Sequence, residues 1–475
     1  MFSPVKALNT IPADPKKIHL IAVCGTAMGA LACMLKDLGY HVTGSDTAVY
    51  PPMSDYLKNA GIEILPGFEA GHIPAGCDLV VVGNAVSIDN PECQEMMRRG
   101  LPYCSMPQAL NALVARDRQV LMVAGTHGKT TTASLLAWLL ENAGRKPSFF
   151  IGGILKNFDR NYQIGTGDYL VVEGDEYDTA FFDKKSKFFH FNPARLILTG
   201  VEFDHADIFA DFDAVKNAFA ELMQTLKPAC RLEACEGAVL DELAAQTPAA
   251  VWRYGTSLAN DWRLGAFSFS DGLAHFEVWY QNELWQAFTA PLVGEHNLTN
   301  ALACIAVACS LGLTKAEIAA GLLSFRGVKR RQEVRGEKNG VIVLDDFAHH
   351  PTAVKATIEA VRAFYPQRRL VAVFEPRSNT SMRSVFQAEY AKAFDAADLA
   401  VISDVPLKHK VPQGQLFSLQ QLLNDLKARG RDACVFDGPD AIVNFLSTSL
   451  TPNTVVLIMS NGGFGGIHQK LLNAL

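Results

Sequence analysis

The stretch GTHGKTTT, Gly125–Thr132, decides how the whole chain is interpreted, because it separates two apolar segments. The run QVLMVA (119–124) before it indicates a buried strand, and residues 131–141 after it indicate a helix. A glycine turn between a strand and a helix presents backbone N–H groups to a phosphate. The usual phosphate-loop pattern has glycine where Val123 stands, so the loop is predicted with one departure from that pattern.

The loop is predicted to bind a nucleotide through Gly125, Thr126, His127, Gly128, Lys129, Thr130 and Thr131. Lys129 supplies a positive charge for the terminal phosphates, and the hydroxyl of Thr130 is a ligand for Mg²⁺. We expect the Lys129 side chain to face solvent and to contribute little to the core. The alternative is a plain glycine turn followed by a surface lysine, which the flanking strand and helix disfavour.

Length and composition limit the class of protein. A chain of 475 residues suggests about three domains. The net charge of −6 argues against binding nucleic acid through a broad basic surface. The sequence has neither an apolar run of membrane-spanning length nor a signal-peptide core, and its cysteines form no CxxC pair. We expect a cytoplasmic protein with no nucleic-acid or membrane partner.

Strands alternating with helices predict an α/β fold with open, doubly wound parallel sheets. Strands are expected at 18–23, 41–46, 78–83, 119–124, 169–172, 195–198, 341–344, 369–374, 399–403 and 454–459. We predict an N-terminal Rossmann-like domain over 1–112, a central domain of the P-loop ATPase type over 113–326 and a C-terminal Rossmann-like domain over 327–475. Residues 237–292 are expected to form an antiparallel excursion from the central domain.

Polar residues follow several of these strands and suggest a metal site. Glu173 stands at the tip of the strand after the phosphate loop, where a Mg²⁺ ligand is expected. His205 follows a further strand, so Thr130, Glu173 and His205 are the candidate metal ligands. His205 taken alone is more simply explained as a loop histidine.

Further candidates for the nucleotide site are Asn297, Asn300, Arg331 and Asp346. The two asparagines lie three apart on one helix face, and their amides can hydrogen-bond a purine or a phosphate. Asn297 taken alone is better explained as a helix cap. Arg331 is a candidate for contacting a transferring phosphate, although it lies in a basic run that solvent alone would explain. Asp346 is expected to bind ribose or to orient Lys129.

Substrate contacts are predicted where polar residues follow strands of the outer two units, because open α/β sheets bind ligands at that edge. The candidates are Gly25, Thr26, Ser45, Asp46 and Asn84 in the first unit, and His349, Arg377, Asn379, Ser460 and Asn461 in the third. The turn CGTAMG is a weak dinucleotide signal, since Ala22 and Cys24 stand where glycines are expected. A nucleotide-sugar pyrophosphate fits this turn as well as NAD does.

Taken in order, GTHGKTT, the Glu173 cluster, DHADIF, GEHNLTNALA, the Arg331 motif and DDFAHHP resemble the Mur ligases across essentially the whole chain. The resemblance implies three domains, ATP and Mg²⁺, and an amide-forming reaction of peptidoglycan synthesis. It implies catalytic roles for Lys129, Glu173, His205 and Arg331. Some members carry a carbamylated lysine, and nothing here singles out Lys184, Lys185 or Lys187 for that role.

Within the family, CGTAMGALACMLKDLGYHVTGSD is similar to the members that bind UDP-N-acetylmuramate. The stretches YPPMSDYL, EPRSNT and SNGGFGGIHQKLL resemble the ligase that adds the tripeptide L-alanyl-γ-D-glutamyl-meso-diaminopimelate through an acyl phosphate, in peptidoglycan recycling. The enzyme that adds L-alanine instead is the alternative. Ala22 departs from the glycine usual there, and we expect its methyl to be tolerated. The resemblance is compatible with a monomer or a homodimer.

Two readings from other classes of protein remain at this point. A non-catalytic nucleotide switch would hydrolyse ATP slowly and make no amide. A nicotinamide dehydrogenase would account for the first unit but would leave GTHGKTT without a role.

Overall fold

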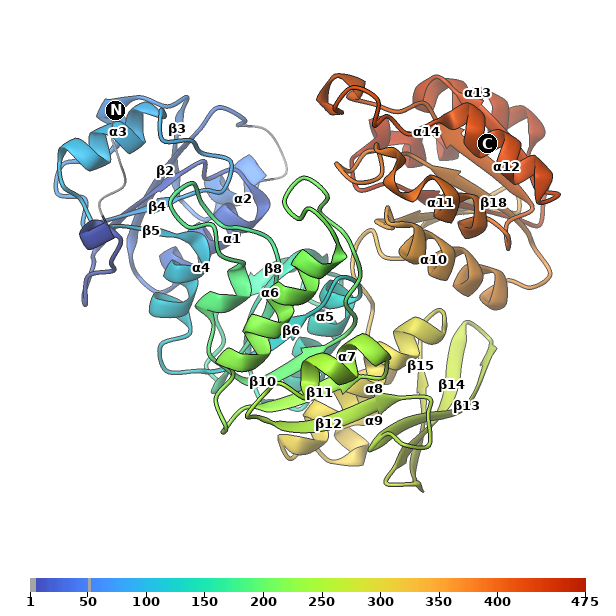
Figure 1. Cartoon of the computed structure of the whole chain (residues 1–475), viewed down its shortest axis with the longest axis horizontal. Coiled ribbons are helices and arrows are strands. Elements are labelled where there is room, and N and C mark those ends of the chain that lie inside the picture. The colour runs from blue at the N-terminus through green and yellow to red at the C-terminus, as the bar shows by residue number, and fades with distance from the viewer. Residues whose placement is uncertain (1–5, 50–52) are drawn as a thin grey trace. The chain divides into compact units, whose positions relative to one another are not determined.

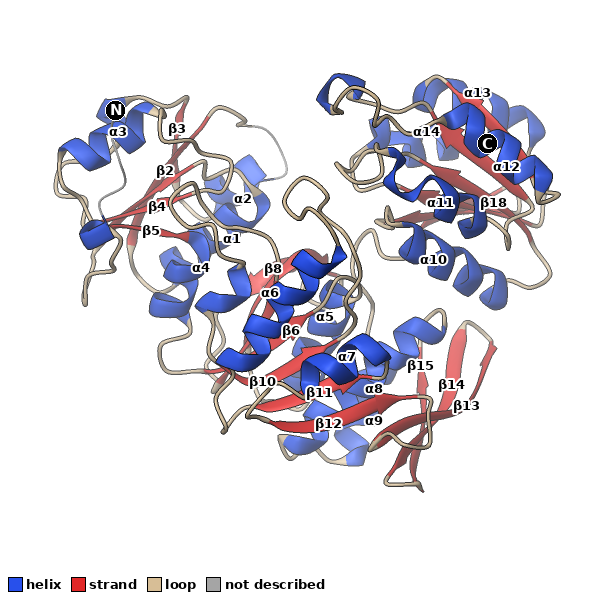
Figure 2. Ribbon diagram, in the orientation of Figure 1, coloured by secondary structure: helices blue, strands red, loops and turns tan. Residues whose placement is uncertain are grey.

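The computed structural model describes residues 6–49 and 53–475 (Figures 1 and 2). Tyr50, Pro51 and Pro52, at the start of YPPMSDYL, lie outside these ranges. The chain forms two compact units, which are described separately. One comprises Met1–Val201, Lys216–Arg253 and Ala306–Glu317, and the other comprises Glu202–Val215, Tyr254–Ile305 and Ile318–Leu475. None of the described helices is both long and apolar enough to cross a membrane.

The first unit begins with a parallel sheet of order β3-β2-β1-β4-β5. Its strands are β1 Lys17–Ile21, β2 His41–Asp46, β3 Glu63–Pro66, β4 Leu79–Val82 and β5 Tyr103–Ser105. Its helices are α1 Thr26–Asp37, α2 Met53–Asn59, α3 Pro91–Arg98 and α4 Met106–Ala109. The predicted strand 18–23 ends two residues early, because Ala22 takes a left-handed conformation with φ of +65°.

The same unit contains the strand that precedes the phosphate loop. Strand β6 lies between β10 and β9 and pairs in parallel with both, within the order β12-β11-β10-β6-β9-β7-β8. The strands are β6 Gln119–Ala124, β7 Ser148–Leu155, β8 Arg160–Gln163, β9 Tyr169–Gly174, β10 Pro193–Leu198, β11 Arg231–Cys235 and β12 Ala250–Gly255. The helices α5 Lys129–Asn142 and α7 Ala238–Ala244 belong to this unit, whereas α6 Phe212–Thr225, α8 Glu295–Ser310 and α9 Lys315–Leu323 each have residues in both units.

The region 237–292 is only partly the antiparallel excursion that we expected. Its first segment is α7, a helix, because Leu240, Leu243 and Ala244 are spaced to bury one helical face. Strand β13 (Trp262–Ser270) pairs in parallel with the last residues of β12. The strands β14 (Leu273–Tyr280) and β15 (Glu283–Ala290) then form the expected antiparallel ladder.

The second unit contains a six-stranded sheet of order β16-β17-β21-β18-β19-β20 in the described residues. The strands are β16 Glu333–Lys338, β17 Val341–Asp346, β18 Arg369–Phe374, β19 Leu399–Ser403, β20 Asp432–Phe436 and β21 Thr454–Met459. The helices are α10 Pro351–Phe364, α11 Gln387–Ala393, α12 Leu419–Ala428, α13 Gly438–Ser449 and α14 Ile467–Ala474. All pairings are parallel except that of β16 with β17.

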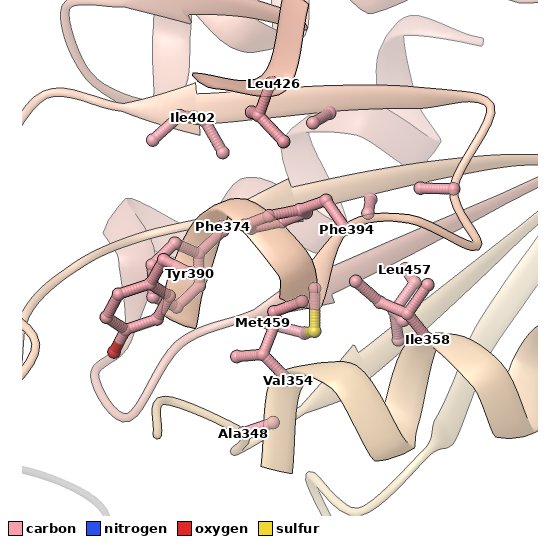
Figure 3. Close-up of a cluster of buried hydrophobic side chains, with 14 of the residues drawn as sticks. Ala348, Val354, Ile358, Phe374, Tyr390, Phe394, Ile402, Leu426, Leu457 and Met459 are labelled. Carbon is pink, nitrogen blue, oxygen red and sulfur yellow. The ribbon is translucent and has the colours of Figure 1, made fainter. Parts of the chain in front are cut away.

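Both faces of this sheet are buried, as expected where helices cover a parallel sheet on two sides. Phe374 and Met459 face one apolar cluster, which α10, α11 and α12 complete (Figure 3). Val373 and Ile458, the preceding residues of the same strands, face the cluster on the other side. This two-sided burial fixes the strand register, so the residues after β17, β18 and β21 emerge together at one edge.

Ala22 should tolerate replacement by glycine better than an ordinary alanine does. The left-handed conformation of an alanine destabilises the folded state by about 1 kcal/mol, and Ala22→Gly removes this cost. The same substitution loses about 0.8 kcal/mol from burial of the methyl group, so the free energy of unfolding should change little. In the matched control Ala30→Gly, inside α1 and buried, both effects destabilise, by about 2 kcal/mol together. Urea unfolding followed by circular dichroism compares the two variants, and equal losses would contradict the strained conformation.

Candidate active site

The phosphate loop is held in shape by two left-handed glycines. Gly125 has φ of +130° and Gly128 has φ of +82°, conformations that favour glycine. The N–H of Thr126 donates to the carbonyl of Gly200 at 2.8 Å, and the Thr199 hydroxyl donates to the carbonyl of His127 at 2.6 Å. Helix α5 begins directly after Gly128, at Lys129. The backbone therefore turns as a phosphate-binding loop requires.

The missing glycine has a structural explanation. Val123 is fully buried in β6 and pairs with Ile197 of β10 and Glu173 of β9. The turn begins two residues later, at Gly125, where a Cβ atom would lie 2.3 Å from the Thr199 hydroxyl oxygen. Close approach to the tip of β10 therefore requires glycine at 125, and no turn exists at 123 that would require another.

Lys129 does not face solvent, contrary to the expectation from sequence. Its side chain is 11% exposed, and its ammonium donates to Glu176 Oε2 at 2.8 Å and to the Gly125 carbonyl at 2.6 Å. Burial lowers the pKa of Lys129, but the charges of Glu176 and Asp175 outweigh burial and raise it overall. The lysine is held charged beside the loop because an acidic cluster follows the neighbouring strand.

Thr130 and Glu173 lie together at the start of α5 and near the end of β9. The Thr130 hydroxyl donates to Glu173 Oε2 at 2.9 Å, and the Gly152 N–H donates to Glu173 Oε1 at 2.6 Å. Burial and the nearby Asp175 carboxylate raise the pKa of Glu173. Asp175 itself contacts the ammonium of Lys187 at 3.1 Å. A hydroxyl and a carboxylate side by side are oxygen donors of the kind that Mg²⁺ takes.

Some of the N-terminal candidates are exposed to solvent, and the others form hydrogen bonds within the domain. Gly25, Thr26 and Asn84 are exposed at the turn and strand tip. Asp46 accepts the N–H of Cys24 at 2.8 Å and the N–H of Ala48 at 2.8 Å, so its carboxylate braces the turn after β1.

The Ser45 hydroxyl is also engaged inside the domain, where it donates to the buried Glu92 at 2.5 Å. Glu92 further contacts His19 and His72, at 3.2 Å and 3.0 Å. Burial acts to raise the pKa of Glu92, but these hydrogen bonds lower it overall.

In the second unit, the loop containing His205 is fastened to the segment that follows β18. The Thr380 hydroxyl donates to Asp204 Oδ1 at 2.8 Å, and the Asn379 amide donates to Asp207 at 2.9 Å. Burial raises the pKa of Asp204, but the neighbouring histidine charges, first that of His349, lower it to about 2. His205 has a left-handed φ of +53° and lies in a loop rather than at a strand tip.

The remaining nucleotide candidates also lie in the second unit. Asn297 donates to the Val293 carbonyl at 2.8 Å and to Gln332 Oε1 at 3.1 Å from within α8, and Asn300 is buried on the same helix face. Asp346 accepts the N–H of Gln332 at 2.8 Å. The guanidinium of Arg331 lies 4.9 Å from the centre of the Phe347 ring. Hydrogen bonds through Gln332 thus connect Asn297 to Asp346, the last residue of β17.

The tips of β18 and β21 bring Glu375, Arg377 and Ser460 together. Ser460 donates to the buried Glu375 at 2.5 Å, and Arg377 donates to the same carboxylate at 3.4 Å. His349, after β17, is held through its carbonyl by the Tyr390 hydroxyl at 2.5 Å. Asn461 has a buried side-chain oxygen with no hydrogen-bond partner in the described part of the chain.

The sequence-based selection omitted several residues that the structure places in these clusters: Glu92, Glu176, Thr199, Arg330 and Glu375. A sequence pattern could have identified two of them, since Glu176 belongs to the acidic cluster after β9 and Glu375 begins EPRSNT. Arg330 lies in the basic run beside Arg331, whereas Glu92 and Thr199 are single polar residues in a helix and a loop that no local pattern distinguishes.

A phosphate loop on a parallel sheet, with further open α/β sheets before and after it, defines a nucleotide-dependent enzyme of several domains. Three family models match in the same order: "Mur ligase family, catalytic domain" over 17–118, "Mur ligase middle domain" over 123–308 and "Mur ligase, glutamate ligase domain" over 330–462. The chain belongs to the Mur ligase family. The predicted α/β fold with three domains, and the classification as a ligase, are thereby confirmed.

Three relatives show the likeness. The UDP-N-acetylmuramate–L-alanyl-γ-D-glutamyl-meso-2,6-diaminoheptandioate ligase of Escherichia coli is 41% identical, covering 97% of this chain and 98% of that protein. A UDP-N-acetylmuramate–L-alanine ligase of Carboxydothermus hydrogenoformans is 31% identical over 96% of both. The crystal structure of a murein peptide ligase from Psychrobacter arcticus has a TM-score of 0.71 at 35% identity, covering 97% of this chain and 98% of that one.

Replacing Lys129 should abolish the release of phosphate from ATP and should also lower the free energy of unfolding. In Lys129→Met, Glu176 at 2% exposed loses its cation, which we expect to cost about 1–3 kcal/mol. The double variant Lys129→Met/Glu176→Gln should regain part of that stability but no activity. As a control, Lys355→Met breaks a half-exposed pair with Glu359 and should change stability by less than about 0.5 kcal/mol. Thermal unfolding and phosphate release measure the two effects, and near-normal turnover by Lys129→Met would remove the loop lysine from the reaction.

Proposed function

We propose that this protein joins the tripeptide L-alanyl-γ-D-glutamyl-meso-diaminopimelate to UDP-N-acetylmuramate at the expense of ATP, in peptidoglycan recycling. The observation that carries the proposal is the match over 97% of the chain to a ligase whose name states these substrates. The identity to the relative named for L-alanine is ten percentage points lower, at 31% against 41%. Because the reaction consumes ATP, we place it in the cytoplasm. We propose that the enzyme is a monomer or a homodimer.

The chemistry explains why ATP is needed. Joining a carboxylate to an amine in water is unfavourable, so the carboxylate must first be activated. The lactyl carboxylate of UDP-N-acetylmuramate attacks the γ-phosphorus of ATP, which gives an acyl phosphate and releases ADP. The α-amine of the tripeptide then attacks the acyl carbon and loses a proton, and phosphate leaves with the electrons of the broken C–O bond.

The phosphate loop fits ATP in its backbone and its charge. The first turn of α5, which begins after Gly128, has backbone N–H groups without partners within the helix, and Lys129 is already held charged beside them. We assign Thr126, His127 and Thr131 to the same loop. Lys129 stabilises the charge that builds up on the transferring phosphoryl group and then on the tetrahedral oxyanion. We assign the same catalytic purpose to Arg331, and nucleotide contacts to Asn297, Asn300 and Asp346.

Thr130 and Glu173 are the residues that we propose to hold Mg²⁺, with His205 as a further ligand. Their oxygen atoms are 2.9 Å apart, which is compatible with two donors to one small cation. When bound, Mg²⁺ neutralises charge on the phosphate oxygens.

The outer domains would supply the two substrates. We propose that Gly25, Thr26, Ser45, Asp46 and Asn84 line the nucleotide-sugar site, and that His349, Arg377, Asn379, Ser460 and Asn461 line the amine site. Domains over 1–112, 113–326 and 327–475 would thus each carry one reactant.

Phosphate release measured with each amine in turn tests the proposed substrate. With UDP-N-acetylmuramate and ATP present, we expect the tripeptide to give a kcat/KM at least about a hundredfold above that of L-alanine, a difference of about 2.7 kcal/mol in transition-state binding. The product should carry the mass of the amide. Equal or better turnover with free L-alanine would establish the alternative instead, and phosphate release without any amine would point to a nucleotide switch.

Glu173→Gln should raise the Mg²⁺ concentration needed for half-maximal rate by about tenfold or more, because it removes the charge that attracts the cation. The amide oxygen of Gln can still accept the N–H of Gly152, and its NH2 group can donate to the Thr130 hydroxyl, which rotates to accept, so the fold should be preserved. Glu221→Gln on α6, whose side chain is 56% exposed, removes one carboxylate elsewhere and serves as the control. An unchanged Mg²⁺ dependence in Glu173→Gln would exclude Glu173 as a ligand.

A further inference from the structure

The tips of β18 and β21 form a closed ring of contacts in the C-terminal domain. Phe374 and Met459 end these strands in register, and the N–H of Glu375 donates to the Met459 carbonyl at 3.0 Å. Glu375 and Ser460 therefore leave the sheet side by side. Both are buried, at 5% and 2% exposed.

Three hydrogen bonds connect the ring, and two of them end on the Glu375 carboxylate. The Gly462 N–H donates to Ser460 Oγ at 2.9 Å, and Ser460 Oγ donates to Glu375 Oε2 at 2.5 Å. The other oxygen of Glu375, Oε1, accepts from Arg377 Nη1 at 3.4 Å. Both oxygens of the buried Glu375 carboxylate therefore accept a hydrogen bond, and Oε1 accepts the one from Arg377.

Arg377 closes the ring by lying across Gly462. A Cβ atom at Gly462 would lie 2.4 Å from Arg377 Cδ and 2.4 Å from Nε. Gly462 does not have a positive φ, so the requirement at this position is space for the arginine and not backbone conformation.

The turn beneath Arg377 is itself fixed and has little freedom to move away from a new methyl group. Arg330 Nη2 donates to the carbonyls of Ser460 and Gly462, both at 2.6 Å. The side chain of Arg377 is 38% exposed, and Glu375 is its one partner in the described residues. Most of its five N–H donors are therefore open to a ligand.

We infer that Gly462 is a positioning residue, which lets Arg377 lie flat on the turn with its guanidinium presented to a carboxylate of the incoming peptide. This inference rests on the proposed function. A planar guanidinium binds a carboxylate through two parallel hydrogen bonds, so its orientation decides the strength of the contact. An arginine held in advance by Glu375 and by the glycine surface also loses less side-chain freedom on binding.

The test compares Gly462→Ala with Gly463→Ala. The methyl at 462 must displace Arg377, whereas Gly463 has φ of −76° and no atom within 4 Å of its Cβ position. In Gly462→Ala we expect the KM for the tripeptide to rise by about tenfold, with a smaller change in kcat and unchanged KM values for ATP and UDP-N-acetylmuramate. Gly463→Ala should behave as wild type.

A double-variant cycle shows whether the effect passes through Arg377. In an Arg377→Ala background, Gly462→Ala should change the tripeptide KM no further, because the side chain that it displaces is gone. Should Gly462→Ala fail to fold, Glu375→Gln removes the negative charge that holds the arginine, and its KM effect should likewise vanish in Arg377→Ala.

An equal rise in KM in both backgrounds would overturn the inference, as would an unchanged tripeptide KM in folded Gly462→Ala. Failure of the proposed function is a separate result. It would appear in the wild-type protein as absence of tripeptide-dependent phosphate release, before any variant is compared.

Discussion

The parallel pairing of β6 with its two neighbours is the constraint on which the nucleotide site depends. Parallel strands end at the same edge, so β9 delivers Glu173 and β10 delivers Thr199 to the place where β6 turns at Gly125. Thr199 excludes any side chain from Gly125, and Glu173 meets Thr130. The loop is therefore shaped from both sides by strands that are distant in sequence. The same principle operates in the C-terminal sheet, where β18 and β21 bring Glu375 and Ser460 together.

Buried glutamates organise three separate edges of the molecule. Glu92 supports Ser45 beneath the first sheet, Glu176 holds Lys129 beside the phosphate loop, and Glu375 holds Arg377 in the C-terminal domain. In each case a buried carboxylate is satisfied by the polar group that it orients, which is the condition under which burying a charge is tolerated. Two of the side chains held in this way, Lys129 and Arg377, are ones that we propose to contact a reactant.

The α/β class and the sheets could be predicted from the sequence because buried parallel strands are continuous apolar runs. The strand tips could be predicted because polar residues follow these runs directly. The strand at 119–124 has the predicted bounds in the structure. Helix α7 was missed because it lies between strands with similar apolar content, so that periodicity over seven residues is a weak signal. The burial of Lys129 could not be predicted, since Glu176 lies 47 residues further along the chain and only the pairing of β6 with β9 makes them neighbours. Likewise, no residue near Asp204 in the sequence indicates its hydrogen bond with Thr380, which lies 176 residues away.

The left-handed Ala22 has a consequence for how this turn can vary. A Cβ atom at Gly83 would lie 3.2 Å from the Ala22 methyl and 3.0 Å from the Ile21 carbonyl oxygen. The two positions share a volume that holds one methyl group, and in this chain residue 22 occupies it. The cost of enlarging residue 83 therefore depends in part on residue 22, 61 positions earlier in the numbering, and in part on the Ile21 carbonyl, which no substitution removes. A substitution at 83 is therefore expected to cost more beside Ala22 than beside a glycine at 22.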